Sequence, residues 1–233
     1  MGNLYLIPTT LGESETSHVI PFEVATIVKQ IKYFIVENIR TARRYLRKLD
    51  SQLNIDELQF FELNQHTNSL VVEEYLKPIF DGFDVGIISE AGCPGIADPG
   101  ADVVKLAHLR QIRVIPLVGP SSILLSLMAS GMNGQNFAFI GYIPVKTAER
   151  IKAIKEIEKR SSVEKQTQIF IEAPYRNTPL LNDLIKTLNV QTMLCVACDL
   201  TLETEYIKTQ TVAQWKKATP DISKRPAIFL IQG

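Results

Sequence analysis

Residues 85–109 have the sequence VGIISEAGCPGIADPGADVVKLAHL, and this stretch decides the fold class. The pattern predicts a strand at Val85–Ser89, because Ile87 and Ile88 continue an apolar run typical of a sheet that is buried on both faces. A loop rich in glycine and proline follows, and Ala101–Leu109 has the apolar spacing of a helix. A strand, a loop and a helix in this order indicate an α/β sheet, in which ligands bind beyond the carboxyl ends of the strands.

The loop Ser89–Gly100 has the residues that such a ligand site needs. Gly92 and Gly95 allow positive φ angles and let a ligand approach the backbone, and the prolines stiffen the loop. Asp98 can cap the following helix, with Pro99 in its first turn. The same residues also fit an ordinary turn, so composition alone leaves both interpretations open.

Strands and helices alternate along the whole chain, which predicts the α/β class. We place a domain boundary near Leu117–Pro120, which gives an N-terminal domain of residues 1–117 and a C-terminal domain of residues 118–233. The last three predicted strands have little helix between them, so the second sheet should be mixed or antiparallel. Besides Val85–Ser89, the predicted strands are Asn3–Ile7, Tyr33–Val36, Gln59–Leu63, Arg113–Leu117, Phe137–Ile140, Gln168–Glu172, Met193–Cys198, Glu203–Lys208 and Ala227–Ile231. Besides Ala101–Leu109, the predicted helices are Val24–Ile31, Arg40–Leu49, Leu70–Phe80, Ser121–Ser130, Ala148–Arg160 and Thr178–Leu188.

The composition is that of an ordinary globular protein, with 45% hydrophobic and 21% charged residues among 233. Acidic and basic residues number 25 each, so no overall field draws the chain to free nucleic acid or to a membrane, although a local basic patch can still dock on a folded ribonucleoprotein. No apolar run has the roughly 18–20 residues of a membrane span, and the first residues lack the features of a secretory signal. The 3 cysteines argue against a disulfide framework, so we expect a cytoplasmic protein without membrane association.

Two other predicted turns can contribute to a ligand site. Pro116–Ser122 (PLVGPSS) opens a helix whose first amide groups can hold a carboxylate, and Ser121 and Ser122 can add hydroxyl hydrogen bonds. One of these serines can equally be a plain helix cap. Ile7–Gly12 (IPTTLG) lacks the glycine pattern of dinucleotide-binding folds, and the chain has no P-loop motif.

Six segments, taken in order, resemble the tetrapyrrole methylase superfamily, and within it the bacterial 16S ribosomal RNA cytidine 2′-O-methyltransferases. The loop motif of that family is S-D-A-G-T-P-x-I-x-D-P-G, and Ser89–Gly100 differs from it only at Glu90 and Cys93. The family begins with V-P-T-P-I-G-N-L, where this chain has LIPTTLGES. The motifs P-L-P-G-P, E-G-F-L-P, I-F-Y-E-S-x-H-R and A-R-E-L-T-K resemble PLVGP, IGYIP, IFIEAPYR and ACDLTL, which begin at residues 116, 140, 169 and 197.

The resemblance implies an α/β, two-domain fold with a mostly parallel N-terminal sheet, a mixed C-terminal sheet and S-adenosylmethionine in the interdomain cleft. It also implies 2′-O-methylation of a ribose in 16S ribosomal RNA, with the RNA or the small ribosomal subunit as partner, and a homodimer. The sulfonium methyl is already activated, so the protein mainly positions the reactants. By position, the implied cofactor-binding residues are Leu11 in the first turn, Ala91, Gly92, Cys93 and Ile96 in the loop, Ser121 and Ser122 on the second-domain helix, and Glu172, Ala197 and Ala227 beside the adenosine.

The acceptor side departs from the family pattern. The family's E-D-T-R is ENIR here, which keeps Glu37 and Arg40, and its H-D-H-N-E is NQHTN, which keeps only His66. These three residues are the candidate catalytic residues, since a ribose hydroxyl needs a base or a polarising group. The structural alternatives are an ion pair between Glu37 and Arg40 at a helix start and a surface histidine in a loop. Tyr175 and Arg176 can also touch substrate.

Three other features have ordinary explanations. Cys195 and Cys198 (CVAC) lie in an apolar strand, where residues three apart point to opposite faces, so a redox or zinc site is not favoured. The 3 histidines are scattered and indicate no metal site. The basic pairs Arg43–Arg44 and Arg47–Lys48 suit a solvated helix face, although they can also contact RNA.

Two other functions stay open. An enzyme of the same fold can methylate a tetrapyrrole or another small molecule, although IPTTLG differs from the G-x-G-P-G-D turn of those enzymes. A non-catalytic protein that binds S-adenosylmethionine or docks on RNA would also fit the changed acceptor side.

Overall fold

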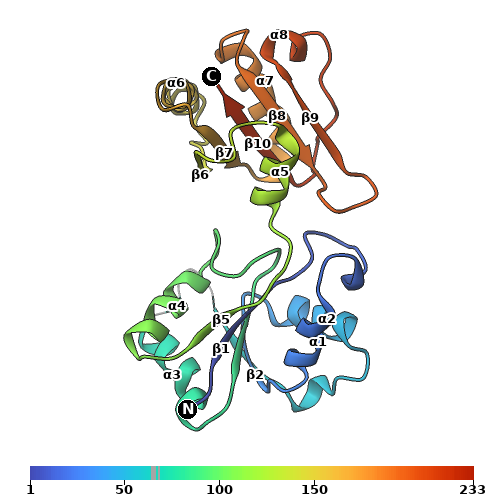
Figure 1. Ribbon diagram of the computed structural model, residues 1–233, viewed down its shortest axis with the longest axis vertical. Helices are drawn as coiled ribbons and strands as arrows, with labels where there is room; N and C mark the ends of the chain where they lie inside the picture. Colours follow the sequence, from blue (N-terminus) through green and yellow to red (C-terminus); the bar gives the residue numbers. More distant parts are fainter. Residues whose placement is uncertain (64–66, 68) are drawn as a thin grey trace. The chain divides into compact units, whose positions relative to one another are not determined.

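The computed structural model describes residues 1–63, 67 and 69–233, which form two compact units, Met1–Ser121 and Ser122–Gly233 (Figure 1). Each unit is an α/β structure with its own five-stranded sheet. The predicted fold class, with a parallel N-terminal sheet and a mixed C-terminal sheet, is confirmed. Among the helices in these ranges, none is long and apolar enough to cross a membrane.

The first unit is built on a parallel sheet with the strand order β3-β2-β4-β1-β5. Strand β4 lies at its centre, and all of its residues are buried, which explains its apolar sequence VGII. The strands are β1 (Leu4–Ile7), β2 (Tyr33–Val36), β3 (Gln59–Glu62), β4 (Val85–Ile88) and β5 (Val114–Pro116). The helices are α1 (Phe22–Val28), α2 (Ile39–Leu49), α3 (Ser69–Phe80) and α4 (Gly100–Leu109), with short 3₁₀ helices at Thr16–His18 and Ile55–Glu57.

Helices cover both faces of this sheet (Figure 1). Helices α1 and α2 pack on one face through residues such as Val24 and Leu46. Helices α3 and α4 pack on the other face through Leu76 and Val103. The chain therefore leaves β1 toward one face and the adjacent β4 toward the opposite face. Neighbouring parallel strands whose connections part in this way open a crevice at their carboxyl ends, where α/β sheets bind ligands.

The second unit has a mixed sheet with the order β6-β7-β10-β8-β9. Its core includes the stacked rings of Phe170 and Phe229, with centroids 5.9 Å apart. The buried Trp215 donates its indole N–H to the carbonyl of Leu194 at 2.9 Å, so its polar group is satisfied. The strands are β6 (Phe137–Tyr142), β7 (Thr167–Ile171), β8 (Met193–Cys198), β9 (Tyr206–Thr211) and β10 (Ala227–Gln232). The helices are α5 (Ser122–Ser130), α6 (Thr147–Glu164), α7 (Asn177–Thr187) and α8 (Val212–Trp215), with a 3₁₀ helix at Pro174–Arg176.

Most predicted elements are present with ends shifted by a few residues, and β9 is displaced furthest from its prediction. We predicted a strand at Glu203–Lys208, whereas the strand runs over Tyr206–Thr211. The residues before it form a turn in which Asp199 and Thr201 have positive φ angles of 49° and 71°. Because the chain reverses direction in this turn, pairing with β8 begins later than the residue pattern indicates.

Candidate functional site

Three turns of the first unit meet beyond the carboxyl ends of β1, β4 and β5. The backbone N–H of Thr9 donates to the carbonyl of Gly92 at 2.9 Å, which joins the first turn to the loop Ser89–Gly100. Gly119 of the third turn lies so close to Pro8 that a Cβ at Gly119 would be 2.1 Å from the proline Cβ. The turns predicted from the sequence therefore form one cluster.

Gly92 has no room for a side chain in this cluster. Its φ angle is +75°, and a Cβ would lie 3.2 Å from Leu11 Cδ2 and 3.3 Å from the carbonyl oxygen of Pro120. The Cys93 thiol lies 3.4 Å from the same carbonyl, and burial raises the pKa of this thiol. Cys93 is thus a protonated, weakly donating group that fits the packing of the loop. The structure brings Leu11, Gly92 and Cys93 together, as the resemblance implied.

Asp98 closes the other half of the loop. Its Oδ1 accepts the backbone N–H groups of Gly95 and Gly100, each at 2.8 Å. Burial raises the pKa of this carboxyl, and the two N–H groups act in the opposite direction. We expected Pro99 in the first helical turn, but α4 begins at Gly100 and Pro99 is its N-cap residue. Asp98 therefore bonds the first N–H of the helix from just outside it.

The remaining implied cofactor residues of this unit lie at its surface or its end. Ala91 is exposed, and Ile96 is 55% exposed. Ser121 is the last residue of the unit. The prediction that Ser121 lies on the helix is wrong by one residue, because α5 begins at Ser122. The proline and glycine of the preceding turn, Gly119 and Pro120, keep the chain out of the helix at this point.

A cavity of about 340 Å³ lies between the first turn, the start of the loop and helix α2. The hydroxyl of Tyr45 donates to the carbonyl of Pro8 at 2.6 Å and holds α2 against the first turn. Of the implied cofactor residues, only Leu11 lines this cavity. Sequence reasoning missed most of its walls, because spacing does not show that α2 packs beside the strand ends. The lining residues are Thr9, Thr10, Leu11, Gly12, Glu13, Val36, Thr41, Ala42, Arg44, Tyr45, Lys48, Ile88, Ser89 and Glu90.

The candidate Glu37 lies beside this cavity. Its Oε1 accepts the backbone N–H of Glu90 at 3.4 Å. Burial raises the pKa of Glu37, the hydrogen bond from Glu90 opposes this change, and the carboxylates of Asp98 and Glu90 reinforce it. A raised pKa makes Glu37 a stronger base than an exposed glutamate.

The candidate Arg40 is exposed on the first turn of α2. Within the described residues it forms no ion pair with Glu37, so the ion-pair alternative is not found. Asn38 holds the helix start instead, because its Oδ1 accepts the N–H groups of Arg40 at 2.9 Å and Thr41 at 3.2 Å. The third candidate, His66, lies outside the described residues, so its role stays a prediction.

In the second unit, Glu172, Ala197 and Ala227 lie at one end of three neighbouring strands. Ile228 of β10 pairs with Ile171 of β7 on one side and with Ala197 of β8 on the other. Glu172 directly follows β7, and Ala227 is the first residue of β10. The strand register therefore brings these three implied cofactor residues together.

Glu172 has one unsatisfied carboxylate oxygen. Its side chain is 1% exposed, and its Oε1 accepts the guanidinium of Arg176 at 2.6 Å and the N–H of Ala173 at 2.7 Å. Its Oε2 is buried without a hydrogen-bond partner among the described residues. Buried oxygens of this kind are rare, so Oε2 can accept a hydrogen bond from a ligand. Tyr175 is exposed, with the guanidinium of Arg176 4.8 Å from its ring.

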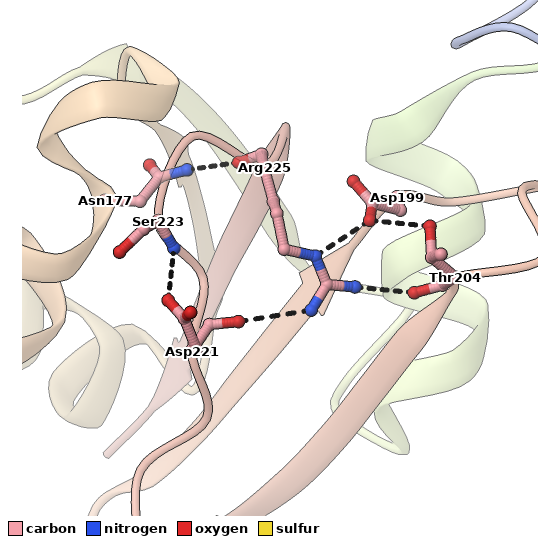
Figure 2. A network of polar contacts seen from close by, with 6 residues as sticks. All are labelled: Asn177, Asp199, Thr204, Asp221, Ser223 and Arg225. Carbon is pink, nitrogen blue, oxygen red and sulfur yellow. Dashed lines mark hydrogen bonds and ion pairs between the residues drawn. The ribbon is translucent and has the colours of Figure 1, made fainter.

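A polar network beside these strands was not predicted from the sequence. Arg225 donates to Asp199 at 2.8 Å and to the carbonyl of Thr204 at 2.5 Å (Figure 2). The hydroxyl of Thr204 donates to the same carboxylate at 2.8 Å. The network fixes the chain leaving β8 against the chain entering β10, the strands that carry Ala197 and Ala227. Its members are far apart in sequence, so no local pattern could reveal it.

The CVAC pair lies in the interior of β8. Cys195 and Cys198 are buried free thiols, and burial raises the pKa of both, that of Cys198 to about 11. A search of the described residues finds no group of three or more His, Cys, Asp or Glu side chains that could hold a metal ion. These thiols therefore pack as small apolar side chains in the sheet.

The fold and the strand-end site are those of the tetrapyrrole methyltransferases. The structure is similar to that of the methyltransferase CobJ, with a TM-score of 0.66 and 14% identity over 100% of this chain and 95% of that chain. It is also similar to native uroporphyrin III C-methyltransferase from Thermus thermophilus, with a TM-score of 0.58 and 11% identity over 99% and 97% of the two chains. At such identities the likeness shows the fold alone.

The sequence is similar to the ribosomal RNA small subunit methyltransferase I of Vibrio cholerae, with 28% identity over 233 residues. The match covers 99% of this chain and 77% of that protein. No protein-family model matches the chain. The resemblance predicted from the motifs is confirmed, since the relative and both structural neighbours are methyltransferases.

Proposed function

We propose that this protein is an S-adenosylmethionine-dependent methyltransferase that methylates a ribose 2′-hydroxyl in the ribosomal RNA of the small subunit. The main support is the loop Ser89–Gly100, which matches the family motif and lies at the crevice of a methyltransferase fold. The similarity of nearly the whole chain to a small-subunit RNA methyltransferase supports the acceptor class.

The residues present fit the cofactor. Gly92 leaves a backbone cradle that a Cβ would fill, and Glu172 Oε2 is free to accept a hydroxyl or amino hydrogen from the adenosine. The first amide groups of α5 can hold the carboxylate of the amino-acid part. We therefore assign cofactor binding to Leu11, Ala91, Gly92, Cys93, Ile96, Ser121, Ser122, Glu172, Ala197 and Ala227.

Bound S-adenosylmethionine supplies a sulfonium methyl group that is already activated for transfer. The protein then has to orient the acceptor hydroxyl and receive its proton. Glu37 is suited to accept this proton because burial raises its pKa. The exposed cation of Arg40 is suited to orient an anionic acceptor. We assign His66 a second, supporting role in proton transfer.

We also propose that the protein is cytoplasmic, where its RNA acceptor is found, and that it forms a homodimer, as the superfamily resemblance implies. Light scattering over a range of protein concentrations tests the dimer. A monomer at every concentration would contradict it.

A transfer assay tests the function. Methyl-labelled S-adenosylmethionine is incubated with the protein and, separately, with unmethylated 30S subunits, protein-free 16S ribosomal RNA or porphyrinoid precursors. Label in an RNA ribose supports the proposal, and label only in a porphyrinoid shows a small-molecule enzyme. Cofactor binding without transfer to any acceptor favours the non-catalytic alternative. No calorimetric binding of S-adenosylmethionine or S-adenosylhomocysteine at millimolar concentration rules out all three.

A further inference from the structure

Helix α2 is strongly basic, although the whole protein has no net charge. Its eleven residues, IRTARRYLRKL, include five cations and no acidic side chain. The cations stand at positions i, i+3, i+4, i+7 and i+8, the spacing that places side chains on one face of a helix. We call this row, Arg40, Arg43, Arg44, Arg47 and Lys48, the cationic stripe.

The core fixes the direction in which the cationic stripe points. On the opposite face of α2, Ala42 and Leu46 are buried in the core of the first unit, and Ile39 and Leu49 pack against it. Arg43 is half-buried and pairs with Asp56 at 2.5 Å. The other four cations are exposed, and among the described residues none of them forms an ion pair.

The cationic stripe leads to the proposed site. From its first to its last residue it spans about 12 Å at 1.5 Å per residue. Arg44 and Lys48 line the cavity together with Leu11 and Glu90, and Arg40 follows Glu37 at the helix start. The row of exposed cations thus runs alongside the place where we put the acceptor hydroxyl.

We propose that the cationic stripe binds the phosphodiester backbone of the RNA acceptor and delivers its ribose to the cavity beside Glu37. This inference rests on the proposed function. A row of cations matches a polymer with regularly spaced negative charges better than it matches a single small anion. A membrane surface fits less well, because a membrane-binding helix needs a free apolar face and that of α2 is buried in the core.

The test compares two double variants. Arg44→Gln/Lys48→Gln removes two exposed cations of the cationic stripe. Lys155→Gln/Lys159→Gln removes two exposed cations with the same spacing from α6 of the second unit. Binding of protein-free 16S ribosomal RNA is measured by fluorescence anisotropy over a salt series. Thermal unfolding and calorimetry with S-adenosylhomocysteine check the fold and the cofactor site.

For Arg44→Gln/Lys48→Gln we expect the slope of log K against log salt to fall by about 1.4 and RNA affinity at 0.1 M salt to fall about 25-fold, from about 0.7 per lost phosphate contact on a single strand. Cofactor affinity and melting temperature should stay unchanged, and the α6 variant should match the wild type. Equal slopes for the two variants would overturn the inference. A parallel loss of cofactor affinity would also overturn it, because the cations would then serve the cofactor.

The two possible failures are distinguishable in the same experiment. A wild type that labels RNA, together with a cationic-stripe variant whose RNA affinity is unchanged, refutes the inference and leaves the proposed function intact. A wild type that neither binds nor labels RNA refutes the proposed function and the inference with it. Binding of vesicles rich in anionic lipid, without RNA binding, has the same meaning.

Discussion

Single residues set the shape of the loop Ser89–Gly100. Gly92 and Gly95 could be predicted to have positive φ angles, and both do, at 75° and 81°. A third positive φ angle, 61°, falls on Ala97, which no residue preference predicts. It accompanies the closure of the loop by Asp98, whose carboxylate joins backbone groups on both sides of Ala97. Prediction therefore succeeded where the residue's own preference decides the conformation and failed where its neighbours do.

Gly92→Ala should abolish cofactor binding without unfolding the protein, because the methyl group would press on Leu11 and on the Pro120 carbonyl. Gly82→Ala is the matched control, since Gly82 has a φ angle of +92° and open space around its Cβ position. Both variants should lose about 1–2 kcal/mol of unfolding free energy through the left-handed backbone. Calorimetry with S-adenosylhomocysteine separates them, and binding retained by Gly92→Ala would refute the loop assignment.

Glu37→Gln should reduce methyl transfer about 10²–10⁴-fold with little change in cofactor affinity, because the amide cannot accept the proton. The wild-type rate should rise with pH through the raised pKa of Glu37, since only the ionised carboxylate is a base. Single-turnover transfer measured across an acidic pH series, with a parallel binding titration, gives both results. A variant with wild-type rates would remove Glu37 from the mechanism.

Asp98 gives the loop a pH-dependent stability. Burial raises the pKa of this carboxyl above its ordinary value of 3.8, so the folded state binds the proton more tightly than the unfolded state. The contribution of Asp98 is then fully present below pH 3.8 and is lost as the pH rises through the raised pKa. Asp98→Asn keeps the acceptor oxygen and does not titrate, so its stability relative to the wild type should increase from acid to neutral pH.

Denaturant unfolding across this pH range measures the effect. Asp98→Ala is the reference, since it loses two hydrogen bonds and should cost about 2 kcal/mol at any pH in the series. If the difference between wild type and Asp98→Asn were constant with pH, Asp98 would have an ordinary pKa.

At the level of elements, helix α2 shows why a departure from the family motif need not alter the structure. Asn38 stands where the family has aspartate, and its side-chain oxygen accepts the first free N–H groups of the helix. Ile39 replaces threonine and packs against the core. The sequence showed that an acid and a hydroxyl were missing. It could not show that asparagine keeps the capping role, because this depends on where the helix begins.

Asn38→Ala should lower the unfolding free energy by about 1 kcal/mol, the usual cost of losing an N-cap side chain. Asn38→Asp should be neutral or slightly stabilising, because it restores an acceptor and adds a negative charge at the helix start. Chemical denaturation with matched slopes tests the pair. Equal losses in both variants would show that the cap is not the reason for asparagine at this position.

On the scale of the whole molecule, the sequence predicted both sheets and nearly all their strands, because buried strands and amphipathic helices have strong local patterns. Strand order, register and the Asp199–Arg225 network could not be predicted, since they depend on contacts between distant residues. The proposed site lies in the same category. Its cofactor residues come from both units, and only the three-dimensional structure shows which of them share a strand end.

Saturation with S-adenosylhomocysteine should therefore protect both units against hydrogen exchange. At a ligand concentration of 100 times Kd, the stabilisation is about 2.7 kcal/mol for whatever part unfolds with loss of the site. Amides of β4 in the first unit and β8 in the second should both exchange more slowly. Protection confined to one unit would mean that the other unit contributes nothing to cofactor binding.

The position of β10 also affects how the second unit forms during translation. This strand comes last among the strands in sequence, yet it lies between β7 and β8 in the sheet. The first unit can fold once β5 has left the ribosome, whereas the second sheet must wait for residues 227–232. At about 5–20 residues per second, the interval is roughly 6–23 s. Throughout that time β7 and β8 are synthesised but lack their shared partner, so the nascent second unit is exposed to misfolding and to chaperones.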